Sequence, residues 1–398
     1  MEMPYADERR ALQAQVDALV DEHGRAHDAV ACAKVELGEV CQAMGAYDEA
    51  QAHFEAALQW FAMPDQQSTP DACNVRNTLG ELCILQGQSN AAIAHYAAAV
   101  EAMVTLLRPY CPGLDAGDLM DSDASIPDAV ARILVHSISG HGEALRLSGQ
   151  YAEAETQQRW ALQLVTSRFG TTHLDAASVL LGLGVNMKYQ ARYDEAWTYY
   201  QRAKSILEAT YGIDHPELAS VWYNLGGVFH GRGQYAEGVP YVRKALALHE
   251  QAFGREHPTT TLFLSQLAAL LDGAGEVDEA KTLYHESIDG LTQHFGRLHR
   301  DVAVNLNNLG QLAMAAGDYK AAEQAFAEAI AIKEAILGAE HADVATTLTN
   351  LSVLYLRQGR VNEAVPLLER AHRLVCAAFG DQHPRAQIVE SYLQDARA

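Results

Sequence analysis

Histidines recur between residues 173 and 383 at a spacing of 42 residues. They are His173, His215, His257, His299, His341 and His383. Imidazole can bind zinc or transfer protons near neutral pH, so these histidines are the first candidates for chemistry. Packed helices lie about 10 Å apart, whereas zinc ligands must converge within about 2.3 Å of the ion. The spacing therefore favours a loop residue that orients the start of a helix over a metal array.

Side-chain amides form a second row with the same spacing, made of Asn224, Gln266, Asn308 and Asn350. An amide both donates and accepts hydrogen bonds. A row of amides can therefore pair with the N–H and C=O groups of an extended peptide, whatever its sequence. The alternative is structural, with the amides capping neighbouring backbone or bridging adjacent repeats.

His136, Glu143 and His230 are the candidates for acid–base chemistry, because all three are expected on the inward face of first helices. The sequence contains no phosphate-binding loop, no dinucleotide-binding glycine motif, no H-E-x-x-H and no G-x-S-x-G. His23 and His27 share a spacing of four residues near Cys32, but no fourth ligand is evident, so we expect no metal and no cofactor. An enzyme or enzyme accessory stays a minor hypothesis.

Internal repeats explain the two rows. A phrase of the form Gly-x-Tyr/Val-x-Glu-Ala begins at Gly45, Gly149, Gly275 and Gly359, and looser copies begin at Gly87, Ala191, Gly233 and Gly317. The steps are 42 residues, except for one step of 62, so the chain holds eight units and one insertion of 20 residues. Within a unit, apolar residues at helical spacing indicate two helices separated by glycine.

The sequence motifs of unit 5 are His215-Pro216, Asn224-Leu225-Gly226, Gly233-Gln-Tyr235, Ala245-Leu246 and Phe253-Gly254. This pattern, over roughly residues 27–380, resembles the tetratricopeptide repeat in its long kinesin-light-chain variant. The resemblance implies an all-α, right-handed solenoid of eight helix pairs, whose inner wall is lined by the first helices. It also implies peptide binding by wall residues, namely Asn224, Gln266, Asn307, Asn308, Gln311, Asn350, Tyr223, Tyr189, His230, Lys188, Arg146 and Arg357.

The register divides the chain into five parts. They are an N-terminal helical cap (1–26), units 1 and 2 (27–108), an insertion loop (109–126), units 3 to 8 (127–380) and a C-terminal capping helix (381–398). First helices are predicted at 27–44, 70–86, 127–148, 174–190, 216–232, 258–274, 300–316 and 342–358. Second helices are predicted at 47–62, 90–107, 151–168, 193–210, 235–252, 277–294, 319–336 and 361–378. From Asp121 the sequence of the insertion is similar to the start of a calcium-binding loop, but Ile126 stands where such a loop requires glycine. We therefore expect a surface loop.

Composition narrows the class of partner. The 398 residues carry a net charge of −22, which disfavours nucleic acids and anionic membranes. No apolar run reaches about 18 residues, so no transmembrane helix is expected. The absence of an export signal and of paired cysteine spacings predicts a cytoplasmic protein with reduced thiols.

The leading hypothesis is a scaffold that binds a protein or peptide partner along the wall of units 3 to 8, and self-association is a further option. The alternative is a sensor that changes its pitch when it binds a small ligand or signal peptide. A carboxylate clamp is disfavoured because Arg146, Lys188 and Arg357 are scattered over distant units. Few inward positions are acidic (Glu81, Glu143 and Asp272), which favours a ligand recognised through its backbone over a strongly basic one.

Overall fold

The computed structural model describes residues 6–24, 27–61, 63, 70–116, 127–381 and 383–397. Over these residues the chain forms α-helices, two short 3-10 helices and no strand. First helices are α2 (Asp28–Ala43), α4 (Pro70–Leu85), α6 (Asp128–Leu147), α8 (Leu174–Tyr189), α10 (Ala219–Gly231), α12 (Pro258–Ala274), α14 (Arg300–Ala315) and α16 (Ala342–Arg357). Second helices are α3 (Tyr47–Phe61), α5 (Ser89–Leu107), α7 (Tyr151–Phe169), α9 (Tyr193–Tyr211), α11 (Tyr235–Phe253), α13 (Val277–Phe295), α15 (Tyr319–Leu337) and α17 (Val361–Phe379).

The helix prediction is confirmed throughout, with bounds that agree within one or two residues apart from the first helix of unit 5. There the short 3-10 helix η2 (Pro216–Leu218) precedes α10. The terminal helices α1 (Ala6–His23) and α18 (Pro384–Arg397) take the predicted capping positions.

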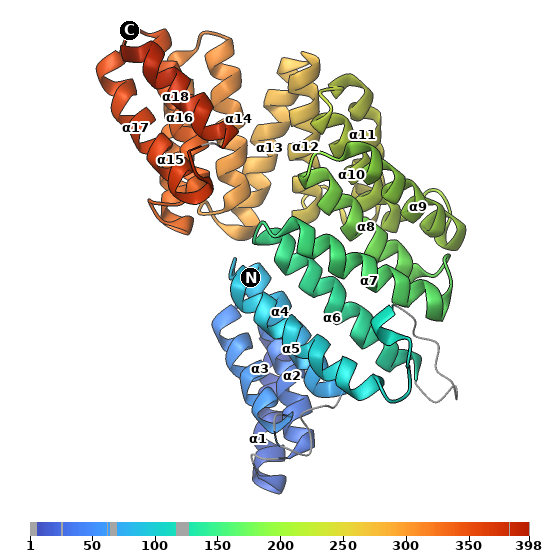
Figure 1. Ribbon diagram of the computed structural model, residues 1–398. Coiled ribbons are helices and arrows are strands. Elements are labelled where there is room, and N and C mark those ends of the chain that lie inside the picture. Colours follow the sequence, from blue (N-terminus) through green and yellow to red (C-terminus); the bar gives the residue numbers. More distant parts are fainter. Residues whose placement is uncertain are drawn as a thin grey trace. The chain divides into compact units, whose positions relative to one another are not determined.

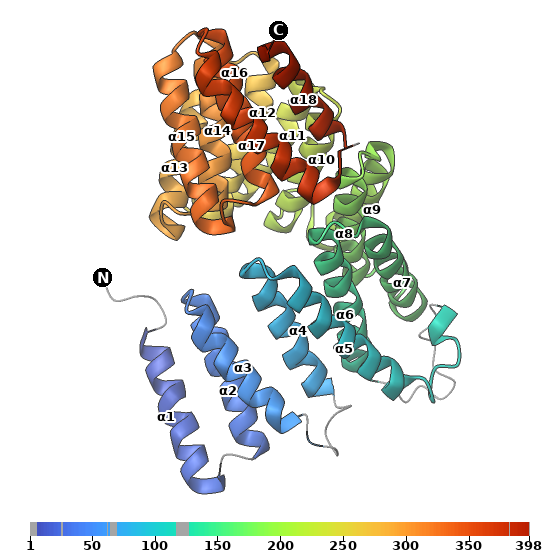
Figure 2. The same cartoon turned by 60° about the vertical axis from the view of Figure 1, so that its left-hand side comes forward.

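The chain forms two compact regions: the N-terminal unit (residues 1–210), which holds repeat units 1 to 4, and the C-terminal unit (residues 211–398), which holds repeat units 5 to 8. The helices of each unit pack as consecutive antiparallel pairs (Figure 1), and Figure 2 shows α1 to α5 following one another in chain order. Such pairs cannot bury their apolar faces alone, so stacking of neighbouring pairs supplies the core.

Close contact within each helix pair depends on a small residue on the first helix. The side chain sixteen residues later, on the second helix, covers it: Gly80 faces Tyr96, Gly184 faces Tyr200 and Gly310 faces Phe326. A Cβ added at Gly310 would lie 2.6 Å from a ring carbon of Phe326. The three rings are at most 2% exposed. These glycines therefore act as sockets for the largest core side chains.

The turn between the paired helices requires a left-handed residue. Glycine holds this position in seven units, with φ between 71° and 89°, whereas Ala191 holds it in unit 4 with φ of 58°. An L-residue adopts this conformation at a cost of about 1 kcal/mol, which the stacking of helix pairs must offset.

The histidine ladder caps the first helices. The Nδ1 atoms of His173, His257 and His299 accept the backbone N–H two residues later, at 3.2, 3.2 and 3.3 Å. His215, His341 and His383 do the same. The imidazole of His299 also stacks on Phe295, with ring centroids 4.7 Å apart. The predicted role at the start of each helix is confirmed, because the imidazole satisfies one of the unpaired N–H groups of the first turn.

Replacing His299 with alanine is expected to lower the free energy of unfolding by about 1 kcal/mol, because the first turn of α14 loses its side-chain acceptor. His299→Asn should retain most of that stability, since asparagine is a preferred N-cap residue. Chemical denaturation followed by circular dichroism measures both, and His285→Ala, at an exposed position within α13, is the matched control. An equal loss in all three variants would contradict the capping role.

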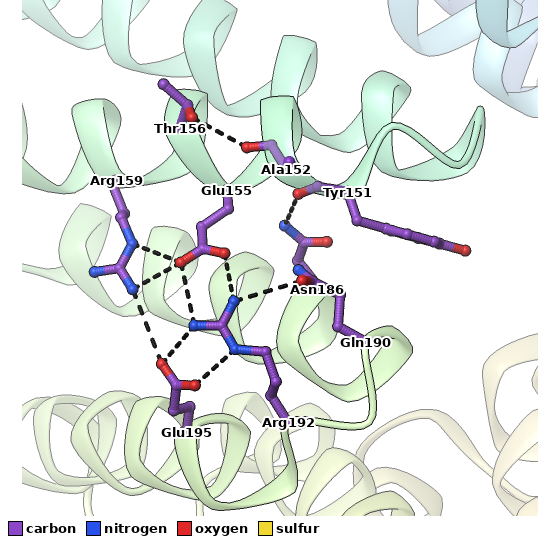
Figure 3. Close-up of polar contacts among 9 residues, drawn as sticks. All are labelled: Tyr151, Ala152, Glu155, Thr156, Arg159, Asn186, Gln190, Arg192 and Glu195. Atoms are coloured by element: carbon purple, nitrogen blue, oxygen red, sulfur yellow. Dashed lines mark hydrogen bonds and ion pairs between the residues drawn. The ribbon is translucent and has the colours of Figure 1, made fainter.

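An ion-pair network fastens neighbouring pairs together in the N-terminal unit (Figure 3). Arg192, in the α8–α9 turn, donates from Nη1 to Glu155 of α7 at 2.6 Å and from Nε to Glu195 of α9 at 2.6 Å. Four repeats later, Arg360 makes the same contacts with Glu323 and Glu363, at 2.8 and 2.7 Å. The recurrence shows that the network belongs to the repeat architecture.

One helix of the described residues, α5, is long and apolar enough to cross a membrane by length and composition. The apolar stretch of α5 is interrupted by His95 and Glu101, so the expectation of no transmembrane helix stays a prediction. Tyr96, Met103 and other apolar side chains of α5 are buried, and the helix packs against α4 and α6. A core helix of a repeat protein has these same properties. Of the insertion, residues 117–126 lie outside the described residues, and so does the loop that begins at Asp121.

Candidate functional site

The first helices of each unit present a wall that the second helices do not cover. In the C-terminal unit, the amide row lies on α10, α12, α14 and α16, once per repeat. Asn224, Gln266, Asn308 and Asn350 are all half-buried. The repeat register therefore places the predicted amides at equivalent points of successive helices.

The amides of this wall are hydrogen-bonded to one another and to the backbone. Asn350 Nδ2 donates to Asn307 Oδ1 at 2.9 Å, and Asn307 Nδ2 lies 3.5 Å from Asn308 Oδ1. Gln266 Nε2 donates to the carbonyl of Tyr223, in the preceding repeat, at 3.2 Å. Asn224 Nδ2 donates to the Ser220 carbonyl of its own helix at 2.9 Å. The structure thus contains the bridging arrangement that was the alternative to a peptide ladder.

Other predicted wall residues of this unit differ in accessibility. Gln311, Arg357 and His230 are exposed, and His230 lies edge-on to Tyr235 at 5.4 Å. Tyr223 stacks on Phe263, with ring centroids 4.8 Å apart, and is half-buried. Gln311 and Arg357 can therefore reach a partner directly, whereas Tyr223 mainly joins two repeats.

Two predicted basic residues meet in the N-terminal unit. Arg146 ends α6 and Lys188 ends α8, one repeat later, and burial together with the charge of Arg146 lowers the pKa of Lys188 to about 8. The Arg146 guanidinium also lies over the ring of Tyr189, 5.0 Å from its centroid, and donates to Glu143 at 3.1 Å. The expectation that these basic residues are scattered is wrong for Arg146 and Lys188, because they occupy equivalent positions of adjacent repeats. Arg357 belongs to the other unit.

The N-terminal unit also contains two cavities on its first-helix wall. One, of about 480 Å³, is lined by Glu81, His136 and Glu143, among others. The other, of about 380 Å³, is lined by Glu36, Glu39 and Asp71 together with His136. Sequence reasoning missed Glu36, Glu39 and Asp71, although the spacing of Cys32, Glu36 and Glu39 along α2 could have revealed a shared face. The expectation that few inward positions are acidic is therefore wrong for this unit.

The enzyme hypothesis requires a closed pocket around His136 and Glu143. His136 Nε2 pairs with Glu81 Oε1 at 2.9 Å, and the His136 and Glu143 side chains are 55% and 51% exposed. His230 belongs to the C-terminal unit. Among the described residues, no group of three or more histidine, cysteine or acidic side chains is placed to hold a metal ion. The side chains of His136 and Glu143 therefore lie on an open wall and not in the closed pocket that the enzyme hypothesis requires.

Comparison with known proteins agrees with this architecture. The tetratricopeptide repeat model matches residues 29–103, 131–209, 188–237, 217–293 and 301–377. No curated protein matches the chain by sequence.

Three solved structures are similar to this chain. The apo form of RapI is 14% identical, with a TM-score of 0.54, covering 76% of this chain and 96% of that chain. A Rap protein complexed with Competence and Sporulation Factor is 11% identical, with a TM-score of 0.51, covering 93% and 98%. The putative kinesin light chain repeats of Podosopora anserina are 20% identical, with a TM-score of 0.43, covering 52% and 98%. At these identities the two Rap structures, with TM-scores above 0.5, support the fold alone. The repeat model, which matches most of the sequence, shows that the chain belongs to the tetratricopeptide repeat family.

Proposed function

We propose that this protein is an interaction scaffold that binds an extended segment of a protein partner along its first-helix walls, with the amides of the C-terminal unit as the main contacts. The family membership supports a protein-interaction scaffold. The observation that carries the finer proposal is the amide row on α10 to α16, which lies beside the exposed Gln311 and Arg357.

The internal hydrogen bonds of the row are compatible with binding. Each primary amide has two N–H donors and one carbonyl acceptor with two lone pairs. Asn350 uses one N–H donor in its hydrogen bond to Asn307 Oδ1. The side chain is half-buried, so its remaining groups can face a peptide backbone. The bridges between repeats hold the amides in place before the partner arrives, which reduces the entropy lost on binding.

Replacing Asn308 and Asn350 together with alanine is expected to weaken capture of partners by about fivefold to 150-fold, because the loss of two hydrogen bonds removes about 1 to 3 kcal/mol of binding free energy. Affinity capture from the native cell extract, quantified by mass spectrometry against the unmodified protein, identifies the partners and measures the loss. Purified partner segments then give the dissociation constants.

A matched control is the double variant Gln324→Ala and Asn362→Ala, which removes two exposed amides from the second helices α15 and α17. Because Asn350 supports the nearly buried Asn307, thermal unfolding of both variants must be compared at the assay temperature. Unchanged capture by a folded Asn308/Asn350 variant would show that the amide row is not the binding element.

A second candidate is a regulatory sensor whose superhelix pitch changes on binding a small ligand or signal peptide. The full-length similarity to a Rap protein complexed with Competence and Sporulation Factor favours this option. It predicts a decrease in the radius of gyration by solution scattering when ligand is added, whereas a static scaffold predicts no change. The cytoplasmic location and the option of self-association stay predictions from the sequence.

A further inference from the structure

The N-terminal unit has a continuous acidic wall that the proposed amide mechanism does not use. Its two cavities are lined mainly by residues of the first helices α2, α4, α6 and α8, which Figure 2 shows in part, and His136 lines both cavities. The smaller cavity collects Glu36, Glu39 and Asp71, and the larger collects Glu81 and Glu143. The two cavities therefore form one acidic surface that crosses successive first helices.

Most of these carboxylates have no cationic partner. Over the described residues, Glu36, Glu39 and Asp71 form no ion pair, while Glu81 pairs with His136 and Glu143 with Arg146. The local potential is correspondingly negative. Burial, and then the charges of Glu36 and Glu81, raise the pKa of Glu39. Burial, and then nearby carboxylates that include Asp71 and Glu36, raise the pKa of Cys32.

A buried amide provides an independent sign of a ligand. Asn77 lines the smaller cavity and is 2% exposed, yet neither its Nδ2 nor its Oδ1 has a hydrogen-bond partner within the described part of the chain. Gln158 lines the larger cavity and is 3% exposed, and its Oε1 also has no hydrogen-bond partner among the described residues. Buried polar groups are nearly always hydrogen-bonded, so an entering donor group would satisfy the side-chain carbonyl oxygens of Asn77 and Gln158, which the fold leaves unpaired.

We propose that this acidic wall binds a basic segment of a protein partner, with an arginine side chain in the cavity lined by Glu36, Glu39, Asp71 and Asn77. A guanidinium presents five N–H donors and no acceptor, which matches a site made of carboxylates and an amide carbonyl. The second cavity, beyond His136, would take another basic residue of the same segment. A peptide is favoured over a free polyamine because Asn74, Thr78 and Ser139 line the cavities between the charges and offer groups for pairing with a peptide backbone.

This site is separate from the amide row, so each can be tested without the other. The probes are short fluorescein-labelled Gly/Ser peptides that carry two arginines separated by one, two or three residues, and matched peptides with citrulline in place of arginine. Citrulline keeps the shape and removes the charge. Spermidine serves as a cation without a peptide backbone. Binding to the full-length chain is measured by fluorescence anisotropy and by competition.

We expect at least one arginine peptide to bind about tenfold more tightly than its citrulline match, since charge-assisted hydrogen bonds are about twice as strong as neutral ones. The double variant Glu36→Gln and Glu39→Gln should remove that difference. The control variant Glu101→Gln and Glu153→Gln makes the same charge change at exposed positions of α5 and α7 and should preserve it.

Three outcomes would overturn the proposal: equal binding of arginine and citrulline peptides, equal losses in the two double variants, or competition by spermidine as strong as that by the arginine peptide. If the Glu36/Glu39 variant does not fold, Asp71→Asn tests the same cavity from α4. A photo-crosslinking group beside the arginine gives a second readout. Crosslinks to α2, α4 or α6 support the site, and crosslinks confined to other helices contradict it.

Discussion

Replacing Gly184 with alanine is expected to lower the free energy of unfolding by about 2 kcal/mol. Helix propensity alone predicts the opposite, because alanine is favoured over glycine within a helix by about 1 kcal/mol. A Cβ at Gly184, however, would overlap the ring of Tyr200, which is fully buried. Overpacking a core commonly costs about 1 to 3 kcal/mol, and here the rigid ring has no exposed direction in which to move. Steric overlap should therefore outweigh propensity.

The neighbouring Gly182 supplies the control on the same helix. A Cβ there would lie 3.3 Å from the side-chain nitrogen of Gln158, the end of a flexible side chain. Gly182→Ala should therefore be neutral or slightly stabilising. Urea denaturation midpoints of the two variants measure the contrast, and a stabilised Gly184→Ala protein would contradict the socket interpretation.

The repeat itself suggests a compensating change. Unit 8 places Ser352 and Leu368 at the positions of Gly184 and Tyr200, so a slightly larger residue is accommodated there opposite a smaller partner. The double variant Gly184→Ser and Tyr200→Leu should be less destabilised than the sum of its single changes. Such coupling is expected of residues in direct contact.

Much of the fold could be predicted because each repeat carries local signals at fixed positions. A capping histidine precedes the first helices of units 4 to 8, although in unit 5 it caps the short helix η2 that leads into α10. A left-handed glycine separates the helices of seven pairs. Both act within a few residues of where they occur in the sequence. Helix bounds therefore followed from the 42-residue period without knowledge of tertiary contacts.

The candidate site was less predictable because the repeat register shows which residues occupy equivalent positions but not which of them touch. The period placed Asn307 and Asn350 on the same wall, but only coordinates show that they hydrogen-bond to each other. The repeat period also did not reveal the acidic wall, because its residues lie on α2, α4 and α6, before the first histidine of the 42-residue row, His173. The unsatisfied amide of Asn77 has no signature in sequence at all.

The second large effect is expected on acidification. Burial lowers the pKa of His53, His95 and His141, and in His249 burial and then the charge of His257 lower it. In the unfolded chain these groups titrate near about 6.5. As the pH falls below that value, the unfolded state binds protons that the folded state does not, so the free energy of unfolding decreases. The ion-paired Glu155 and Glu323 have lowered pKa values, so their contribution to the free energy of unfolding is lost only at more acidic pH.

We therefore expect the urea midpoint to fall between pH 7.5 and pH 5, with four histidines contributing. His249→Gln tests the mechanism at one of them. The His249 ring is 8% exposed, and its Nδ1 lies 2.8 Å from Thr260 Oγ1, a contact that glutamine can replace without taking up a proton. This variant should show a smaller difference in midpoint between the two pH values than the unmodified chain, whereas His285→Gln, at an exposed position, should not. Removing a buried imidazole that titrates only in the unfolded state must reduce the proton uptake that drives acid unfolding. An identical pH difference in the His249 variant and the unmodified chain would therefore refute the assignment.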